Sequence, residues 1–382
     1  MRSVGLDLGA RHIAFCEVKD GLVVERASVR KLEQLRSRIG PDCPAARVAF
    51  EASREAWHVH DTLVAWGHDP KLLDTTRVRA LGVGHHKRKN DALDAEVAAR
   101  AVDAGRIPEA HVLSPDRRAM RAQLSVRGAL VETRAHYITT IRGLGRAAGM
   151  LLPTCASGNF LVKIGESALD DATRALVAPL VAVLTGLEVE LAKVEQTLSQ
   201  MATREPIVAL LATVPGVGLI VASTFVSVID EAKRFKNAQA VGAYLGLVPS
   251  ESTTGGPGKR RLGSITKQGN TYARTMLVQA AWHILRARDV DDPLRQWADR
   301  IAKARGKKIA AIALARKLAG VLWAMWRDGT AYDPVAQAQS SARGTREKAR
   351  TSDAQAAALE RAAKKLERTR SRSTKTSEVA MS

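Results

Sequence analysis

Short apolar runs open the chain, and segments with helical apolar spacing follow them. Residues 3–8 (SVGLDL), 12–18 and 22–29 predict three strands, with a turn at Asp20-Gly21 joining the second to the third. The elements expected next are a helix at 30–39, a strand at 46–51, a helix at 54–67, a strand at 70–73 and a helix at 91–105. Three strands followed by alternating helices and strands predict an α/β sheet covered by helices.

The last of these helices has residues at both ends that favour a helix boundary. Asn90 fits the N-cap position, and Gly105 fits the stop at the C-terminus. The order of elements resembles the ribonuclease H-like fold of RuvC-type Holliday-junction resolvases and of many transposases. The expected fold class is therefore an α/β ribonuclease H-like (RuvC-like) domain followed by a mainly helical region.

Two long helices are predicted next, at residues 116–148 and 174–202. The second has apolar residues at near-heptad spacing, namely Leu176, Leu180, Val183, Leu187, Leu191, Val194 and Leu198. This spacing favours a coiled-coil or helical-hairpin arm. It is equally typical of an amphipathic helix packed on its own domain.

A third region spans residues 205–333. It opens with two apolar helical stretches joined at Pro215-Gly216-Val217-Gly218, and a tail rich in Ala, Arg, Lys, Ser and Thr follows Pro334. The predicted division is an α/β domain at 1–110, a helical linker and arm at 111–204, a C-terminal domain at 205–333 and a basic, disordered tail at 334–382.

Composition narrows the class of protein. The 382 residues, 46% of them hydrophobic, suffice for two or three packed domains. No apolar run reaches the roughly 18 to 20 residues of a bilayer span, and the N-terminus lacks the apolar stretch of a signal peptide. We therefore expect a cytoplasmic protein with no membrane partner. The three cysteines form no CxxC pair and the histidines no HExxH motif, which disfavours a zinc site.

The charge points to a partner. The chain has 59 Lys+Arg against 39 Asp+Glu, a net charge of +20. Residues 341–382 contribute 11 Lys+Arg and 5 Asp+Glu, so +6 lies in the tail and +14 remains in the rest. A basic surface attracts phosphate backbones and releases their condensed counterions. The charge predicts a nucleic-acid-binding, nucleoid-associated protein.

Four acidic residues stand out as candidate metal ligands. Asp7 lies inside an apolar strand, where a carboxylate costs free energy unless it is paired or binds a cation. Glu51 closes another apolar strand, and Asp91 and Asp94 are three residues apart at a helix start, so they point to one side. Carboxylate oxygens suit Mg²⁺ or Mn²⁺. Two such ions can activate a nucleophile and stabilise a leaving oxygen in phosphodiester cleavage.

Each acid also has an ordinary explanation. Asp91 and Asp94 could only complement the helix dipole, and Glu51 could be a strand-end residue. Asp7 is the hardest to explain without a function. Together, in this order of elements and on a basic chain, the four favour the metal-binding interpretation.

The glycine-rich turn at 215–218 resembles a helix-hairpin-helix. Backbone N–H groups around Gly216 and Gly218 could hold a phosphate without reading sequence. A plain helix–helix turn is the alternative.

Residues 246–270 (GLVPSESTTGGPGKRRLGSITKQGN) predict a loop rich in glycine, hydroxyls and cations. The cations are Lys259, Arg260, Arg261 and Lys267. A hydroxyl beside several cations can attack a phosphodiester while the cations stabilise the transition state. From this chemistry alone, a phosphate-binding loop without a covalent role is the favoured alternative.

These motifs together resemble the insertion-sequence transposases with a DEDD tetrad, the one-ten family, over nearly the whole chain up to about residue 333. The matching segments are GLDLGA at 5–10, VAFEAS at 48–53, KNDALD at 89–94, VPGVG at 214–218, YLGLVPSE at 244–251 and GSITKQGN at 263–270. Each motif alone is weak, and six in the right order are strong.

The resemblance implies a recombinase with a RuvC-like N-terminal domain and a C-terminal transposase domain, acting on double-stranded DNA as a dimer or tetramer joined partly through the coiled-coil arm. Some members are guided by a structured RNA that bridges donor and target DNA. The implied active site is composite, because the tetrad of one subunit meets a nucleophilic serine from another subunit, which bonds transiently to DNA.

One position departs from this family. The serine expected before a glycine is replaced by Thr254 in the run 249–255 (PSESTTG). Thr254 is the favoured nucleophile, Ser252 could substitute by a register shift, and an inactive copy is the third option.

Two other classes compete with a recombinase. The GLDLG strand also resembles the first phosphate loop of actin-like and sugar-kinase ATPases, but no second glycine-rich phosphate strand or adenosine motif follows. A non-catalytic or decayed nucleic-acid-binding protein would retain binding and lose nothing on replacement of Asp7.

Overall fold

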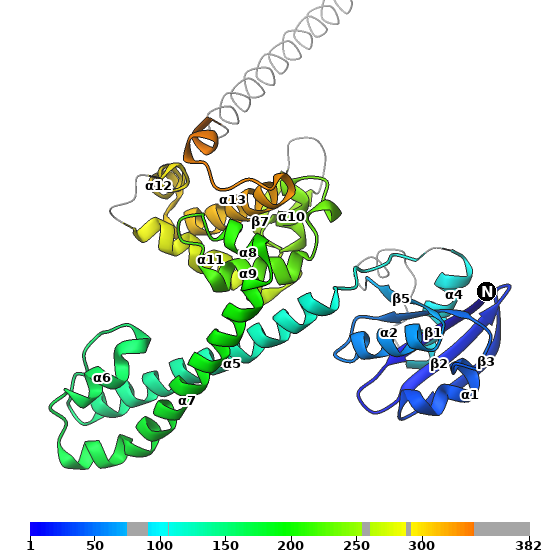
Figure 1. Ribbon diagram of the computed structural model, residues 1–382, viewed down its shortest axis with the longest axis horizontal. Helices are drawn as coiled ribbons and strands as arrows, with labels where there is room; N and C mark the ends of the chain where they lie inside the picture. Colours follow the sequence, from blue (N-terminus) through cyan, green and yellow to red (C-terminus); the bar gives the residue numbers. More distant parts are fainter. Residues whose placement is uncertain (75–90, 106, 254–259, 288–291, 340–382) are drawn as a thin grey trace, which may run out of the picture. The chain divides into compact units, whose positions relative to one another are not determined.

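The computed structural model describes residues 1–74, 91–105, 107–253, 260–287 and 292–339. Its packing divides the chain into two compact units, Met1–Leu113 and Ser114–Ser382 (Figure 1). Each unit has its own hydrophobic core. The predicted division into three domains and a tail stays a prediction, and the tail from residue 340 lies outside the described residues.

The first unit contains a five-stranded mixed sheet of order β3-β2-β1-β4-β5. The strands are β1 (Arg2–Leu8), β2 (Ile13–Lys19), β3 (Leu22–Val29), β4 (Ala46–Glu51) and β5 (Asp69–Leu73). β2 runs antiparallel to both β1 and β3, whereas β4 runs parallel to β1 and β5. All five predicted strands are confirmed to within one residue at each end. The topology is compatible with a ribonuclease H-like domain.

The turn between β2 and β3 has the geometry its sequence predicts. Lys19 pairs with Leu22, and the two residues between them, Asp20 and Gly21, have φ of 51° and 78°. Two positive φ angles in a two-residue connection favour a twisted hairpin, which glycine and aspartate adopt readily. This turn fixes the register of the first hairpin.

Helices cover both faces of the sheet. One face packs against η1 (Leu32–Leu35), α1 (Arg36–Ile39) and α2 (Ala56–Ala65), and the other against α4 (Asp91–Asp103). The helix predicted at 30–39 is confirmed, as a 3₁₀ helix followed by a short α-helix. Gly105, with φ of 64°, confirms the predicted stop after α4, whereas Asn90 lies outside the described residues.

A helical arm opens the second unit. It consists of α5 (Pro115–Ala147) and α7 (Asp171–Thr203), which lie side by side, with η2 (Ser157–Asn159) and α6 (Phe160–Gly165) near the tip (Figure 1). Ion pairs Arg127–Glu195 and Arg134–Glu188 join the two long helices. Both predicted long helices are confirmed. Pro179 lies inside α7.

The apolar register of the arm differs in part from the prediction. The buried residues of α7 recur every seven positions at Val177, Leu184, Leu191 and Leu198. Leu176 and Val183, expected in the seam, are 57% and 52% exposed. The predicted spacing is confirmed, but in the first half of the helix the buried position is one residue further along the chain.

The rest of the second unit is a helical domain built around α13 (Lys307–Asp328), whose buried face includes Leu314 and Leu318. Around it pack α8 (Pro206–Leu211), α9 (Leu219–Ile229), η3 (Ala232–Arg234), α10 (Ala238–Tyr244), α11 (Thr271–Arg286) and α12 (Pro293–Arg305). A two-stranded sheet, β6 (Pro249–Thr253) and β7 (Arg260–Ile265), interrupts the helices.

Within the part of the chain that the structure describes, two helices, α7 and α13, are long and apolar enough to cross a membrane by length and composition alone. Core helices pass the same test, and α13 is such a helix because its apolar face packs in the core of the second unit.

Candidate active site

Asp7 lies on the α4 face of the sheet. Val4 and Leu6 of β1 pack into the core under α2, so the residues between them face the other side. Gly5 is one of these, and a Cβ at Gly5 would stand 1.9 Å from the carbonyl oxygen of Ala95 in α4. Asp7, two residues further along and half-buried, shares the face of Gly5.

Glu51 lies at the neighbouring strand end on the same face. β1 and β4 pair in parallel with Gly5 opposite Ala49 and Leu6 opposite Phe50. The same register carried one residue further sets Glu51 beside Asp7, on strands about 4.8 Å apart. Ala49 packs with α4 residues, and Glu51 follows it by two positions. Both carboxylates therefore lie where β1 and β4 end.

Helix α4 brings its two acids to the same end of β1. Ala95 and Ala99 of this helix lie against Gly5. The start of the helix lies further along β1, towards Asp7, because Asp91 is close to Gly9. A Cβ at Gly9, just after β1, would stand 3.5 Å from the Oδ2 atom of Asp91. Asp94 lies in the same first turn and is partly buried. The backbone thus brings the ends of β1 and β4 and the start of α4, which carry the four predicted acids, to one end of the sheet.

The four side chains do not form a completed ligand set. Among the residues that the structure describes, no group of three or more His, Cys, Asp or Glu side chains is close enough to hold a metal ion. Glu51 and Asp91 are exposed, so their side chains have room to move. Carboxylate oxygens nevertheless have the chemistry that a hard divalent cation prefers.

Charged contacts that were not predicted from the sequence hold α4 in place. Glu96 forms ion pairs with Arg26 of β3 and with Arg100, and Arg100 also donates to the Gly21 carbonyl oxygen at 2.6 Å. Hydrogen bonds from Arg26 and then Arg100 lower the pKa of Glu96. Asp103 accepts a 2.8 Å hydrogen bond from the Gly21 N–H. The only sequence signal was the i,i+4 spacing of Glu96 and Arg100.

The predicted turn between two apolar helices is confirmed at residues 212–218, between α8 and α9. Gly216 has φ of 79°, and a Cβ there would meet Ile284 of α11 at 2.7 Å. Helix packing therefore requires this glycine. Gly218 is the N-cap of α9, and its Cβ position is open. Phosphate binding by either glycine stays a prediction.

Two paired strands, β6 and β7, lie within the segment expected to be a loop at 246–270, so the loop prediction was wrong over those strands. β6 and β7 pair antiparallel, with Ser252 opposite Arg261 and Thr253 opposite Arg260. The Ser250 hydroxyl donates to the Ser264 carbonyl oxygen at 2.9 Å. Thr254 and Lys259 lie outside the described residues.

Backbone contacts fix the segment after the hairpin. Lys267 has φ of 56° and donates its N–H to the Gly246 carbonyl oxygen at 3.1 Å. A Cβ at Gly269 would stand 2.1 Å from the Tyr244 carbonyl oxygen. The Arg274 guanidinium donates to the carbonyl oxygens of Leu245, Gln268 and Gly269. The hairpin is thereby tied to α10 and α11.

Comparison with known proteins adds an independent observation. Residues 208–295 match the family model described as Transposase IS116/IS110/IS902 family. Over 299 residues the chain is 30% identical to a "Probable family 20 transposase" of Pseudomonas aeruginosa, covering 76% of this chain and 87% of that protein.

Two further relatives are transposases of named elements. The chain is 29% identical to the transposase for insertion sequence element IS1328 of Yersinia enterocolitica, covering 86% of this chain and 98% of that one. It is 24% identical to the transposase for insertion sequence element IS1111A of Coxiella burnetii, covering 85% and 89%. By this similarity over most of its length, the chain belongs to the IS116/IS110/IS902 family of transposases.

Proposed function

We propose that this transposase cuts and rejoins DNA strands with Asp7, Glu51, Asp91 and Asp94 as ligands of Mg²⁺ or Mn²⁺. The proposal is supported by one observation: β1 and β4 end side by side, and the start of α4 lies near Gly9, just after β1, so the backbone positions of the four acids lie at one end of the sheet. Divalent ions bound there would stabilise charge on the attacking and leaving oxygens of a phosphodiester.

The nucleophile in this proposal is a hydroxyl of the β6–β7 segment, Thr254 first and Ser252 in reserve. Its oxygen bonds to the DNA phosphorus, the bond from phosphorus to the departing deoxyribose oxygen breaks, and that oxygen takes up the hydroxyl proton. The hydroxyl of a second DNA end then attacks the same phosphorus, and the side chain regains its proton as it leaves. Each step replaces one phosphate ester with another, so the reaction consumes no nucleotide cofactor.

Arg261 supports the choice of this segment, because its strand position is opposite Ser252 and a guanidinium stabilises the charge of a phosphoryl transition state. We place the nucleophile and the tetrad in different subunits of a homo-oligomer, as the family resemblance implies. The exposed Leu176 and Val183 of α7 supply an apolar surface for assembly through the arm.

An excision assay with Mg²⁺ on a plasmid carrying the element tests the proposal. We expect Asp7→Asn and Asp94→Asn to lower product by about a hundredfold or more, because charge stabilisation of this kind is worth several kcal/mol. Asp42→Asn, an exposed acid of the same unit, is the matched control and keeps activity. Normal excision by both tetrad variants would refute the metal-site proposal.

Trapping a protein–DNA adduct decides between the two hydroxyls. Thr254→Ala is expected to abolish the adduct, and mapping of the modified residue gives Thr254. An adduct on Ser252 would identify Ser252 as the nucleophile instead. Binding of DNA without excision in the wild type would favour the alternative, a non-catalytic nucleic-acid-binding protein.

A structured guide RNA is a further part of the proposal. The net charge of +20 supports binding of a second polyanion besides DNA, and a protein of this kind acts in the cytoplasm at the nucleoid. Excision by protein treated with ribonuclease, with and without RNA from the element's end added back, tests the guide. Full activity of the RNA-free protein would exclude it.

A further inference from the structure

The connection between α12 and α13 is a tight corner in the second unit. α12 ends at Arg305 and α13 begins at Lys307, so Gly306 alone joins the two helices (Figure 1). Gly306 has φ of 87° and ψ of 153°, a combination that only glycine adopts readily. Its N–H donates to the Ala302 carbonyl oxygen at 2.9 Å, and its own carbonyl oxygen accepts from the Ala310 N–H at 3.1 Å. The backbone of the corner is therefore fixed by both helices.

Positive side chains gather at this connection. Arg300 and Lys303 are exposed and three residues apart, on the face of α12 opposite Leu294 and Ala298, which are buried in the core. Three more exposed cations follow within five residues. We call the whole set the basic corner, and its members are Arg300, Lys303, Arg305, Lys307 and Lys308.

The charge of the basic corner is not balanced by neighbouring acids. Within the residues that the structure describes, none of its five cations forms an ion pair, and Asp299, the nearest acid in the sequence, pairs with Arg295 at 3.6 Å. A helix rises about 1.5 Å per residue, so Arg300 and Arg305 are roughly 7.5 Å apart along the axis. This is less than the Debye length of about 10 Å at 0.1 M salt. The cations therefore repel one another even in salt.

Two of these cations also oppose a helix dipole. Lys307 and Lys308 are the first two residues of α13, and its first turn contains no acid. The start of a helix carries the positive end of the dipole, so positive side chains are unfavourable there. Their position costs stability, which favours a role in binding over a role in folding. An anionic partner would relieve both the repulsion and the dipole penalty.

The side chains around the cations indicate which anion fits. The exposed residues of 300–309 are the five cations, Ala304, Gly306 and Ile309, so no exposed aromatic ring is available there for base stacking. The nearby Trp297 ring is covered by Lys317, whose Nζ lies 5.1 Å from the ring centre. Cations without stacking rings contact phosphates and carry no sequence information.

A nucleic-acid duplex matches this surface better than a single strand. It carries one negative charge for about every 1.7 Å of its axis, twice the density of one strand. Its phosphates are spread along two backbones, so the five cations need not meet at one point. Long lysine and arginine side chains can each reach a different phosphate.

We propose that the basic corner binds the phosphate backbone of a nucleic-acid duplex, without preference for base sequence. Duplex DNA and duplex RNA share this chemistry, and the experiment below distinguishes them. The inference goes beyond the proposed function, because it needs neither the four acids nor the β6–β7 hydroxyls.

Fluorescence anisotropy of labelled oligonucleotides with the full chain, at several salt concentrations, tests the proposal. Duplex DNA, duplex RNA and single-stranded DNA of one length are compared. We expect Lys307→Gln/Lys308→Gln and Arg300→Gln/Lys303→Gln each to weaken duplex binding about tenfold. The salt slope should fall by about 0.9 for each lost phosphate contact, so by about 1.8 in each double variant. A duplex of scrambled sequence should lose the same affinity.

Matched variants separate the basic corner from general effects. Arg146→Gln/Lys193→Gln removes two exposed charges from the arm and is expected to bind duplexes like the wild type. Lys307→Arg/Lys308→Arg retains the charges and should retain binding. Thermal unfolding of Lys307→Gln/Lys308→Gln should give an unchanged or higher Tm, because repulsion and an opposed dipole are removed.

Wild-type duplex affinity and salt slope in both corner variants would overturn the proposal, whatever Asp7→Asn does to excision. An equal loss in the arm variant would show an effect of net charge alone and would also overturn it. So would a lower Tm of Lys307→Gln/Lys308→Gln, because the cations would then stabilise the fold. A larger loss for the single strand than for either duplex would refute the choice of a duplex. If the proposal is correct, the duplex that loses more affinity is the one that the basic corner binds.

Discussion

Gly5 and Ala95 are in direct backbone contact, since a Cβ on Gly5 would stand 1.9 Å from the Ala95 carbonyl oxygen. No side chain separates α4 from β1 at this point. The distance between Asp7 on the strand and Asp91 and Asp94 on the helix therefore depends on the glycine. A larger residue would push the helix, and its two acids, away from the sheet.

Gly5→Ala is expected to lower the free energy of unfolding by about 1–3 kcal/mol, because the atoms that the methyl group meets are backbone and cannot rotate away. Excision should fall as well. Urea denaturation and the excision assay measure the two effects. Gly143→Ala in α5, where the Cβ position is open, is the control and should leave stability unchanged or raise it by up to about 1 kcal/mol. Equal stability of both variants would contradict the close approach.

The Glu96 carboxylate is expected to make the stability of the first unit decrease at low pH. Hydrogen bonds from Arg26 and Arg100 lower the pKa of Glu96 in the folded state. Its contribution to stability is therefore fully present above the pKa of the unfolded state and is lost as the pH falls through the pKa of the folded state. The Tm difference between wild type and Glu96→Gln should thus be largest near neutral pH and vanish in acid. Glu190→Gln, on a surface ion pair of the arm, should show little difference at any pH. A difference that grows in acid would refute this.

The register of the arm can be tested with two leucines of one helix. Leu191→Ala should lower the free energy of unfolding by about 2–5 kcal/mol, because Leu191 is 3% exposed and a cavity remains. Leu176→Ala should change it by no more than about 0.5 kcal/mol. Calorimetry gives the stabilities, and light scattering tells whether Leu176 contributes to assembly. A larger cost at Leu176 than at Leu191 in the monomer would restore the register predicted from the sequence.

Arg274→Leu should destabilise the second unit by about 2–3 kcal/mol, because three carbonyl oxygens lose their donor and the one of Leu245 belongs to a buried residue. Arg286→Leu on the same helix removes a guanidinium that lies 5.1 Å from the Trp282 ring centre and should cost at most about 1 kcal/mol. Chemical denaturation followed by tryptophan fluorescence compares them. Similar losses for the two would mean that the Arg274 contacts are not stabilising.

The first unit could be predicted well because its signals are local. Its strands are apolar runs bounded by turn residues, and Asp20-Gly21 specifies the hairpin. That Asp7 and Glu51 are neighbours could be inferred only once the strand order was known, because pairing of β1 with β4 is a contact between distant parts of the chain. Nothing in the sequence around Gly5 indicates that a helix packs directly against it.

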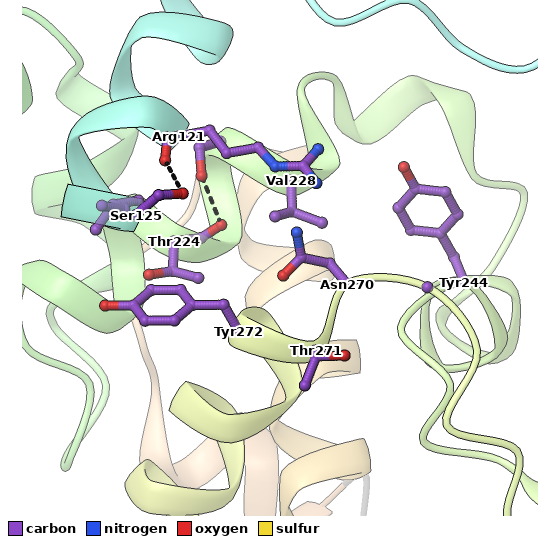
Figure 2. A pocket seen from close by; sticks show the side chains of 11 residues that line it. Arg121, Ser125, Thr224, Val228, Tyr244, Asn270, Thr271 and Tyr272 are labelled. Atoms are coloured by element: carbon purple, nitrogen blue, oxygen red, sulfur yellow. Dashed lines mark hydrogen bonds between the residues drawn. The ribbon is translucent and has the colours of Figure 1, made fainter. Parts of the chain in front are cut away.

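The second unit was harder to predict where two strands pair although their amino-acid composition is typical of a loop. The segment around Ser250 and Ser264 is rich in serine and glycine, which is typical of loops, yet the two strands pair. The seam of α7 was misassigned because Leu176 and Val177 are both apolar, and only packing against α5 decides between them. The pocket lined by residues of α5, α9, α10 and the start of α11 combines four elements, so no local pattern could predict it (Figure 2).

Pro179 makes α7, a long helix of the arm, easier to bend at one level. It has no N–H for the carbonyl oxygen of Ala175, so the helix has one hydrogen bond fewer at that level. Bending there costs less than elsewhere along the rod, and the seam residues Leu184, Leu191 and Leu198 all lie on one side of the weak point. The tip of the arm can thus change its angle to meet another molecule while the packing at its base is preserved.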